Sequence, residues 1–289
     1  MDKIAFIINP ISGTKEKFKI KQIIENELDT QKFEPIFCFT ERCGHATELA
    51  KNFIENGIKF IVAVGGDGTI NETAKALIHT ESALGIVPVG SGNGFALHLK
   101  IPRNIKKAVQ KLNNAQVISV DYGLKNGQPF FCTCGAGFDA HISMEFAKGK
   151  KRGFINYIKK IFSSYFSYKQ ENYTLKNNDI NLNINAFLIT FANASQWGNN
   201  AYIAPKASVT DGLLDITIIS KLPIWAAPSF ALQLFTKKLY KNLYINVLQA
   251  SEITLFREKT GAFHFDGEPC QEGKEINIKI VEKGLKIMK

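Results

Sequence analysis

The sequence has no paired set of cysteines and no recognisable metal-binding spacing. Its five cysteines are odd in number and include no C-x-x-C pair, which argues against both a disulfide framework and a structural zinc site. The five histidines fall in no H-E-x-x-H or similar pattern, so each is expected to be a surface or core side chain rather than a metal ligand. Unpaired cysteines of this kind are typical of the cytosol.

Long hydrophobic runs are also missing. The longest apolar region, residues 222–235, contains two prolines and falls short of the ~20 residues that a spanning helix requires. The apolar run near the N-terminus, residues 4–8, is too short for the core of a signal peptide and is expected to be a first strand. We therefore expect a cytoplasmic protein that is peripheral to the inner face of the membrane.

The common phosphate-binding and hydrolase motifs are absent as well. The sequence contains no G-x-x-x-x-G-K-[ST], which excludes a P-loop ATPase, and no G-x-G-x-x-G after a strand, which excludes the usual dinucleotide fingerprint. No G-x-S-x-G elbow occurs, so a serine hydrolase of that type is disfavoured. Any nucleotide must therefore bind in another way.

Acidic residues are fewer than basic ones. The formal charge is 36 − 26 = +10, which favours anionic partners such as nucleotides, acidic lipid surfaces or nucleic acid. No recognisable DNA- or RNA-binding module accompanies this charge, so nucleic acid is not expected as a partner. A solvated basic surface without a specific partner is the plain alternative.

A glycine-rich segment follows the most strongly apolar strand pattern of the chain. Residues 60–65 are apolar and β-branched, which predicts a strand buried on both faces in a parallel sheet. The glycines at 65, 66 and 68 allow backbone N–H groups to approach an anion closely. Thr69 is expected to cap a helix that starts near Ile70.

Asp67 lies within this segment and would repel a bare phosphate. Its carboxylate is therefore expected to contact a Mg²⁺ ion, a ribose hydroxyl or a nucleophile beside the nucleotide. A tight strand-to-helix turn with no ligand would explain the glycines about as well.

Strands and helices alternate over residues 1–115, which predicts a Rossmann-like α/β domain with a parallel sheet. The turns after its strands contain residues 9–13, Thr40, residues 65–69 and residues 90–93. Ligands of parallel sheets bind in the crevice at the carboxyl ends of the strands. These four segments are therefore expected to converge on one site of nucleotide size.

Residues 116–289 show short strands and turns instead, which predicts an antiparallel β domain, a sandwich, whose last few residues can return to the first domain. A helical insertion is expected at about residues 140–168. Within it, the basic residues Lys148, Lys150, Lys151 and Arg152 precede a run of aromatic and apolar residues. Basic residues before an aromatic helix suit an anionic membrane surface, and a core-facing helix with a solvated start is the alternative.

Two Asp-Gly pairs in the β domain, Asp211-Gly212 and Asp266-Gly267, predict hairpin turns. Glu268 follows the second pair and precedes Pro269, so its carboxylate can be held rigidly towards a cleft between the domains. Phosphoryl transfer needs amide donors, a divalent ion and a carboxylate near the attacking hydroxyl. The glycine loops, Asp67 and Glu268 could supply all three.

Taken together, the motifs that contain these residues resemble those of the diacylglycerol kinase catalytic family. This family of lipid kinases also includes sphingosine and ceramide kinases. The resemblance spans almost the whole chain and implies an NAD kinase or diacylglycerol kinase-like first domain with a C-terminal antiparallel β-sandwich. The matching motifs are Asn9-Pro10-x-Ser12-Gly13, Gly65-Gly66-Asp67-Gly68-Thr69-Ile70-Asn71-Glu72, Pro88-x-Gly90-Ser91-Gly92-Asn93-Gly94-Phe95-Ala96, Gly135-x-Gly137-Phe138-Asp139-Ala140, Asp211-Gly212-x-Leu214-Asp215 and Asp266-Gly267-Glu268.

The resemblance implies ATP and Mg²⁺ as cofactors and a lipid hydroxyl as the phosphate acceptor. It implies Glu268 as the base that takes the proton of that hydroxyl, although in sphingosine kinases the equivalent of Asp67 has been given that role. A structural magnesium is implied at Asp211, with Ser208 and Leu213 contributing main-chain oxygens or water contacts. The nucleotide-binding residues that the resemblance implies are Asn9, Pro10, Ser12, Gly13, Thr40, Gly66, Asp67, Gly68, Thr69, Ile70, Asn71, Glu72, Ser91, Gly92 and Asn93.

The acceptor lipid stays open at this point. The loop of residues 90–94 is closer to the sphingosine kinase version than to the Gly-Thr-x-Asn-Asp of many bacterial diacylglycerol kinases, yet Ser143 stands where sphingosine kinases place an acid. Diacylglycerol or a related lipid is expected, with a sphingoid base or ceramide as the alternative. The next alternative is an NAD kinase, although the usual Thr-Gly-Ser-Thr-Ala-Tyr segment of that family is not found in this sequence. The last alternative is a catalytically silent lipid- or nucleotide-binding regulator. A homodimer is compatible with the sequence.

Overall fold

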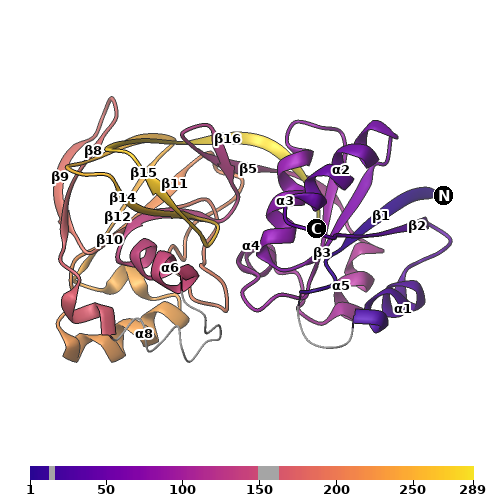
Figure 1. The fold of residues 1–289 in the computed structure, drawn as a ribbon, viewed down its shortest axis with the longest axis horizontal. Coiled ribbons are helices and arrows are strands. Elements are labelled where there is room, and N and C mark those ends of the chain that lie inside the picture. Colours follow the sequence, from indigo (N-terminus) through magenta and orange to yellow (C-terminus); the bar gives the residue numbers. More distant parts are fainter. Residues whose placement is uncertain (13–16, 149–162) are drawn as a thin grey trace. The chain divides into compact units, whose positions relative to one another are not determined.

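The computed structural model describes residues 1–12, 17–148 and 163–289 and divides into two compact units (Figure 1). Unit 1 contains Met1–Tyr122, Gly198–Asn200 and Glu282–Lys289, and unit 2 contains Gly123–Trp197 and Ala201–Val281. The predicted nucleotide residue Gly13 and the basic residues 150–152 lie outside the described parts of the chain.

Unit 1 is built on the predicted parallel sheet, whose strands lie in the order β2-β1-β3-β4 with the C-terminal end of β16 beside β4. The apolar, β-branched sequence of β3 is buried because helices cover both faces of the sheet. The strands are β1 (Asp2–Ile8), β2 (Phe33–Phe39), β3 (Phe60–Gly65), β4 (Ala83–Pro88) and β16 (Glu275–Met288).

The helices of unit 1 pack in two pairs. Helix α2 contacts α3, and α1 contacts α5. Figure 1 shows these two pairs on opposite faces of the sheet. The expected cap of α3 is wrong, because α3 begins at Asp67 after Gly66 and no side chain caps it. Thr69 lies within its first turn. The helices are α1 (Lys17–Glu27), α2 (His45–Glu55), α3 (Asp67–Leu77), α4 (Gly94–His98) and α5 (Ile105–Leu112).

Unit 2 consists of two antiparallel sheets, as predicted. One has the order β16-β13-β8-β9, and the other has the order β12-β11-β10-β7-β14-β15. Side chains from both sheets, among them Tyr173, Phe191, Leu255 and Phe263, form one hydrophobic core. The strands are β5 (Val117–Lys125), which unit 1 shares, β6 (Gln128–Phe130), β7 (Thr133–Gly137), β8 (Glu171–Lys176), β9 (Asn181–Ala186), β10 (Leu188–Ala192), β11 (Leu214–Ile219), β12 (Ile245–Ala250), β13 (Glu252–Arg257), β14 (Gly261–Phe265) and β15 (Glu268–Glu272).

Two details of the β domain differ from the sequence-based expectation. Residues 182–192, which the sequence pattern predicts as one strand, form two strands, β9 and β10, because the chain leaves one sheet and enters the other at Phe187. The Asp211-Gly212 pair forms a bend in the long connection before β11, and it does not join two paired strands. No glycine or proline marks the first break, and an Asp-Gly turn does not require a hairpin.

Short helices lie at one end of unit 2. They are α6 (Phe138–Lys148), the helical residues 163–167, the 3₁₀ turn η1 (Ile224–Ala226), α8 (Ala227–Phe235) and the 3₁₀ turn η2 (Leu239–Lys241). Buried side chains of these segments share a second apolar cluster with Phe187 and Ile219. Among the described residues, no helix has the length and apolar content that crossing a bilayer demands.

Candidate active site

The two glycine loops of unit 1 lie in direct backbone contact. The first loop follows β3 and the second follows β4, so both extend from the carboxyl ends of neighbouring parallel strands. A Cβ atom added to Gly90 would lie 2.5 Å from the Cα atom of Gly66, which is closer than real Cβ atoms come. Only glycine therefore fits at residue 90, and the predicted convergence of these two loops is what the structure shows.

Asp67 joins the two loops through its carboxylate. Its Oδ2 accepts a hydrogen bond from the N–H of Asn93 at 2.7 Å, and its Oδ1 accepts one from the N–H of Gly94 at 2.8 Å. Asn93 has a left-handed backbone conformation, with φ at 55°, and its Nδ2 donates to the carbonyl oxygen of Gly90 at 2.6 Å. Burial raises the pKa of the Asp67 carboxyl, and the two N–H donors oppose that increase.

Asn9 connects the first strand to the same region. Its Nδ2 donates to the hydroxyl of Thr69 at 3.1 Å, and its Oδ1 accepts from the N–H of Ile11 at 3.0 Å. The N–H of Ser12 donates to the carbonyl oxygen of Asn9 at 3.3 Å, which closes the turn that contains Pro10. The structure therefore brings the turn after β1 and the start of α3 together, as the sequence predicts.

The start of α3 has the properties of a phosphate site. No side chain caps this 11-residue helix, and a Cβ atom built on Gly68 would meet nothing within 4 Å. Free N–H groups at a helix N-terminus and the helix dipole favour an anion there. Gly66, Gly68 and Thr69 thus fit the phosphate groups that the family's nucleotide would supply.

Other predicted nucleotide residues have partners within the fold. The carboxylate of Glu72 accepts from the N–H groups of Gly44 at 2.8 Å and Ala46 at 3.2 Å, so it caps the start of α2. Ile70 and Asn71 are buried on the inner side of α3. Thr40 is buried at the end of β2, where its N–H donates to the carbonyl oxygen of Ile8 at 2.9 Å.

Arg103 is a residue of this region that the sequence interpretation missed. One of its terminal nitrogens donates to the carbonyl oxygens of Ser91 and Gly92, each at 3.1 Å, and to Oδ1 of Asn199 at 2.6 Å. The N–H of Asn199 also donates to the carbonyl oxygen of Gly92 at 3.1 Å. Arg103 and Asn199 therefore fix the exposed side of the second glycine loop, where the predicted residues Ser91 and Gly92 lie.

A weak signal for this contact existed in the sequence. Gly198, Asn199 and Asn200 are consecutive, and all three have positive φ angles, at 116°, 51° and 62°. A Gly-Asn-Asn segment indicates a left-handed turn. It does not indicate the partner, because Asn199 lies 96 residues from Arg103 along the chain.

In unit 2, the Asp266-Gly267 pair forms the predicted hairpin turn between β14 and β15. Both residues have positive φ, at 47° and 83°, as a tight two-residue turn requires. The carboxylate of Asp266 accepts from the N–H groups of Phe131 at 2.8 Å, Cys132 at 2.7 Å and Thr133 at 3.2 Å. Glu268, the predicted base, comes directly after this turn and its side chain is exposed.

A buried histidine–carboxylate pair stands beside this hairpin. His264 Nε2 lies 2.8 Å from Oδ2 of Asp139, and the hydroxyl of Thr190 lies 3.4 Å from the same oxygen. His264 precedes the turn on β14, and Asp139 belongs to the first turn of α6. The sequence predicted a surface or core histidine here, not a metal ligand, and it contained no sign of which carboxylate would pair with it.

The predicted magnesium residues lie in the bend before β11. Asp211 accepts through Oδ1 from the N–H of Leu213 at 3.2 Å, and the hydroxyl of Ser208 lies 3.1 Å from that of Thr210. Nearby Asp215 is buried, and burial raises the pKa of its carboxyl to about 6. Carboxylate, hydroxyl and carbonyl oxygens are the donors that Mg²⁺ prefers, so the residues fit this ion. The described residues contain no group of three His, Cys, Asp or Glu side chains that could hold a metal by themselves.

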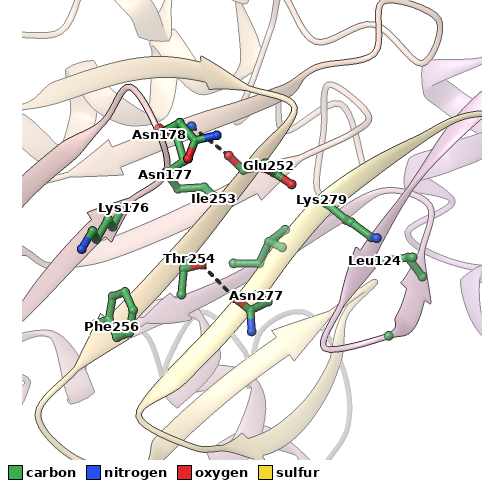
Figure 2. A pocket seen from close by; sticks show the side chains of 12 residues that line it. Leu124, Lys176, Asn177, Asn178, Glu252, Ile253, Thr254, Phe256, Asn277 and Lys279 are labelled. Carbon is green, nitrogen blue, oxygen red and sulfur yellow. Dashed lines mark hydrogen bonds between the residues drawn. The ribbon is translucent and has the colours of Figure 1, made fainter.

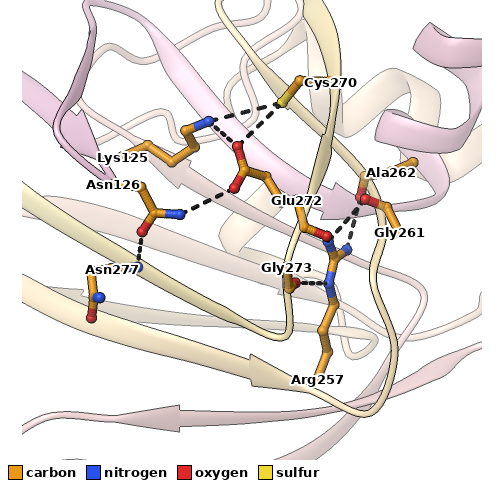
Figure 3. A network of polar contacts seen from close by, with 9 residues as sticks. All are labelled: Lys125, Asn126, Arg257, Gly261, Ala262, Cys270, Glu272, Gly273 and Asn277. Carbon is orange, nitrogen blue, oxygen red and sulfur yellow. Dashed lines mark hydrogen bonds and ion pairs between the residues drawn. The ribbon is translucent and has the colours of Figure 1, made fainter.

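A polar network holds the far end of the β14–β15 hairpin (Figure 3). Arg257 donates to four carbonyl oxygens, those of Gly261, Ala262, Glu272 and Gly273, at 2.7–3.0 Å. The ammonium group of Lys125 is buried and pairs with the carboxylate of Glu272. Figure 3 shows these contacts tying β5, β13 and β15 together, so the hairpin that carries Glu268 is fixed at its base.

The outer face of one sheet of unit 2 carries a hollow of about 460 Å³ (Figure 2). Polar side chains of β8, β13 and β16 line it, and within it the hydroxyl of Thr254 donates to Oδ1 of Asn277 at 2.8 Å. None of the predicted site residues lines this hollow, so it contributes nothing to the candidate active site.

The parallel α/β unit with its glycine–aspartate loop and the antiparallel β unit together define the fold of NAD kinases and diacylglycerol kinases. Residues 3–124 match the diacylglycerol kinase catalytic domain, and residues 132–288 match the YegS C-terminal NAD kinase beta sandwich-like domain. The chain therefore belongs to the lipid kinase family that joins these two domains, as its motifs predicted.

Individual relatives agree with this membership. The chain is 31% identical over 263 residues to "Uncharacterized protein sll0036" of Synechocystis sp. (strain ATCC 27184 / PCC 6803 / Kazusa), an alignment that covers 82% of this chain and 58% of that protein. It is 27% identical over 247 residues to "Probable lipid kinase YegS-like" of Yersinia pestis (strain Pestoides F), with 82% of each chain covered.

Solved structures show the same fold. A diacylglycerol kinase from Bacillus anthracis str. Sterne superposes with a TM-score of 0.77 at 20% identity, covering 99% of this chain and 96% of that one. An NAD kinase from Archaeoglobus fulgidus in complex with ATP superposes with a TM-score of 0.51 at 16% identity, covering 99% and 93%.

Proposed function

We propose that this protein transfers the γ-phosphoryl group of ATP to a hydroxyl group of a lipid, with diacylglycerol or a close relative as the acceptor. The observation that carries the proposal is the pair of touching glycine loops that hold Asp67 beside the uncapped start of α3. An anion-binding helix start suits the phosphates of a nucleotide, and a carboxylate beside it suits the Mg²⁺ that accompanies them. Membership of a lipid kinase family supplies the acceptor class.

Each group of residues has a defined part in this reaction. Gly66, Gly68 and Thr69 would bind phosphate oxygens, and Asn9 would orient Thr69 through its hydrogen bond. Glu268 is the proposed base for the lipid hydroxyl, since it is exposed directly after a turn that three backbone N–H groups anchor through Asp266. When bound, Mg²⁺ would neutralise phosphate charge or stabilise the bend at Asp211.

The decisive experiment incubates the purified protein with γ-labelled ATP, magnesium and separate lipids: diacylglycerol, monoacylglycerol, a sphingoid base, ceramide and undecaprenol. NAD serves as a non-lipid acceptor. Label in diacylglycerol supports the proposal, and label in the sphingoid base or ceramide corrects the acceptor. Label in NAD alone, or in no acceptor, overturns the proposal.

The role of Glu268 has its own test. Glu268→Gln removes the proton acceptor and should lower kcat by at least about 10²-fold while ATP binding, measured by calorimetry, stays within about twofold. Glu282→Gln is the matched control, because Glu282 is also an exposed acid and belongs to none of the sites described. Turnover of Glu268→Gln close to that of the wild type would leave Asp67 as the candidate base.

A further inference from the structure

The segment of residues 222–243 in unit 2 exposes more large apolar side chains than its own packing explains. It contains η1, α8 and η2, and six of its side chains form what we call the apolar patch: Ile224, Trp225, Leu232, Phe235, Tyr240 and Leu243. Trp225 is 74% exposed, Leu232 65% and Leu243 97%. Contiguous exposed apolar surface on a protein marks an interaction site.

The fold of this segment is fixed without the apolar patch. Ala226, Leu234 and Leu239 are buried in the apolar cluster that also contains Phe187 and Ile219. These anchors point into the unit, whereas the six side chains of the apolar patch are exposed to solvent. Helix α8 is thus apolar on its inner face and on part of its outer face, whereas a surface helix normally carries polar residues there.

The three short elements hold together as one surface. The side chain of Asn242 donates to Oε1 of Gln233 at 2.8 Å, and the N–H of Lys238 donates to the carbonyl oxygen of Gln233 at 3.0 Å. The N–H of Tyr202 donates to the carbonyl oxygen of Leu234 at 2.9 Å, which joins the segment to the loop before β11. Figure 1 shows α8 at the end of unit 2 that also carries α6, and α6 contributes Phe138 and Ile142 to the same apolar cluster as α8.

The charge along this part of the chain has one sign. Residues 216–251 contain four lysines and no aspartate or glutamate. Lys237, Lys238 and Lys241 are exposed at the end of α8 and in η2, and Lys206 lies with its ammonium group 5.0 Å from the ring of Tyr240. Aromatic and aliphatic side chains next to lysines match the interface of a bilayer that contains anionic lipid.

We propose that residues 222–243 are the surface by which this protein docks onto an anionic lipid bilayer, with the apolar patch in the interface and the lysines at the headgroups. Its apolar run, residues 222–235, is too short to span a bilayer, and Pro223 and Pro228 interrupt it. Docking of this kind would bring the enzyme to an acceptor that resides in the membrane. This purpose of docking rests on the proposed function, whereas the docking surface itself is inferred from the exposed side chains.

Trp225 provides a direct test of insertion. The chain has two tryptophans, so the Trp197→Phe variant reports on Trp225 alone. On addition of vesicles of phosphatidylcholine and phosphatidylglycerol, the emission of Trp225 should shift to shorter wavelength and lose its access to an aqueous quencher. An unchanged emission under conditions in which the protein sediments with the vesicles would overturn the proposal.

Paired variants separate the apolar and the charged contributions. Leu232→Ser with Leu243→Ser should weaken vesicle binding at least about tenfold, whereas Val117→Ser with Val247→Ser, which also removes exposed apolar side chains, should not. Replacement of Lys237, Lys238 and Lys241 by Gln should weaken binding to the anionic vesicles by about a hundredfold, at about fivefold per lysine. The control replaces the exposed residues Lys51, Lys59 and Lys107 by Gln.

Two further outcomes would also overturn the docking surface. One is a homodimer by light scattering that dissociates in the Leu232→Ser, Leu243→Ser variant, because the patch would then be a subunit interface. The other is vesicle binding that depends only on residues 150–152.

The proposed function is tested separately, with a short-chain diacylglycerol in detergent micelles. The patch variants should keep wild-type turnover in that assay. If no lipid is labelled, the proposed function fails while the vesicle result still decides the surface.

Discussion

Gly90 shows how closely the two loops of the candidate active site approach each other. Its missing side chain lets the loop after β4 touch Gly66 in the loop after β3. Both backbone segments are held by Asp67, so neither can move aside to make room for a methyl group. Gly68 differs, because the space around it is empty on the side where a Cβ atom would lie.

This contrast gives a prediction at the residue scale. Gly90→Ala should lower the free energy of unfolding by about 1–3 kcal/mol, because the added methyl group forces the loops apart. Gly68→Ala should leave it unchanged or raise it by up to about 1 kcal/mol, since alanine favours the helix. Urea unfolding of both variants measures the difference, and equal stabilities would contradict the loop contact.

Arg103 supports a second prediction at this scale. Without its guanidinium, the carbonyl oxygens of Ser91 and Gly92 and the side chain of Asn199 lose a shared donor. In the proposed kinase, Arg103→Met should raise KM for ATP by about fivefold to tenfold, because the loop is less ordered before ATP binds, and kcat should change less.

The comparison for Arg103→Met is Lys107→Met, which removes an exposed cation from α5 that makes no side-chain contact with the loop. Arg103→Lys should recover only part of the affinity, because one ammonium group does not match the planar guanidinium. A fall in kcat with an unchanged KM would show that Arg103 acts on the transferred phosphate and not on loop order.

At the scale of elements, the β14–β15 hairpin is the feature that the surrounding chain is built to fix. Asp266 anchors its turn to the segment between β6 and β7, and Arg257 binds four carbonyl oxygens near its open end. Lys125 and Glu272 close the same region with a pair of opposite charges that is largely buried. A proposed base such as Glu268 needs this rigidity, since proton transfer depends on position.

The Lys125–Glu272 pair provides the prediction for this element. Lys125→Met or Glu272→Gln alone should destabilise the protein by about 3 kcal/mol, because the first leaves a largely buried carboxylate without its cation and the second leaves a buried ammonium group beside Phe263 and Phe265. The double variant should lie within about 1 kcal/mol of the wild type. Thermal or urea unfolding of the four proteins forms a double-mutant cycle, and additive losses would show that the pair does not interact.

At the scale of the whole molecule, the five cysteines report on the two units separately. Cys38 and Cys43 belong to unit 1, and Cys132, Cys134 and Cys270 belong to unit 2. Cys43 is exposed, while Cys132 and Cys134 are buried. Burial raises the pKa of the Cys134 thiol well above its ordinary value, so this thiol stays protonated where an exposed thiol ionises.

Thiol labelling should therefore proceed in resolved phases. Cys43 should react first with an aromatic disulfide reagent, because its side chain is exposed. Cys134 should react only when unit 2 opens, with a rate that follows denaturant concentration more than pH. Cys43→Ser should remove the fast phase alone, and early labelling of Cys134 in the native protein would contradict its burial.

Local sequence patterns were sufficient for much of the architecture. The apolar period of residues 60–65 and the glycines after it predicted a parallel strand and a loop, because backbone conformation there depends on the residues themselves. The Asp266-Gly267 turn was predictable for the same reason. The boundary of α3 was not, because the helix starts at Asp67 only once Asn93 and Gly94 hold its carboxylate.

The sequence by itself thus determined the fold class, the family and the convergence of the two glycine loops. Only the tertiary structure decided which side chains meet: Glu72 with the start of α2, Arg103 with Asn199, and Asp139 with His264. These partners are 28, 96 and 125 residues apart in the chain. Their pairing follows from how whole elements pack, and no local pattern of residue types encodes that packing.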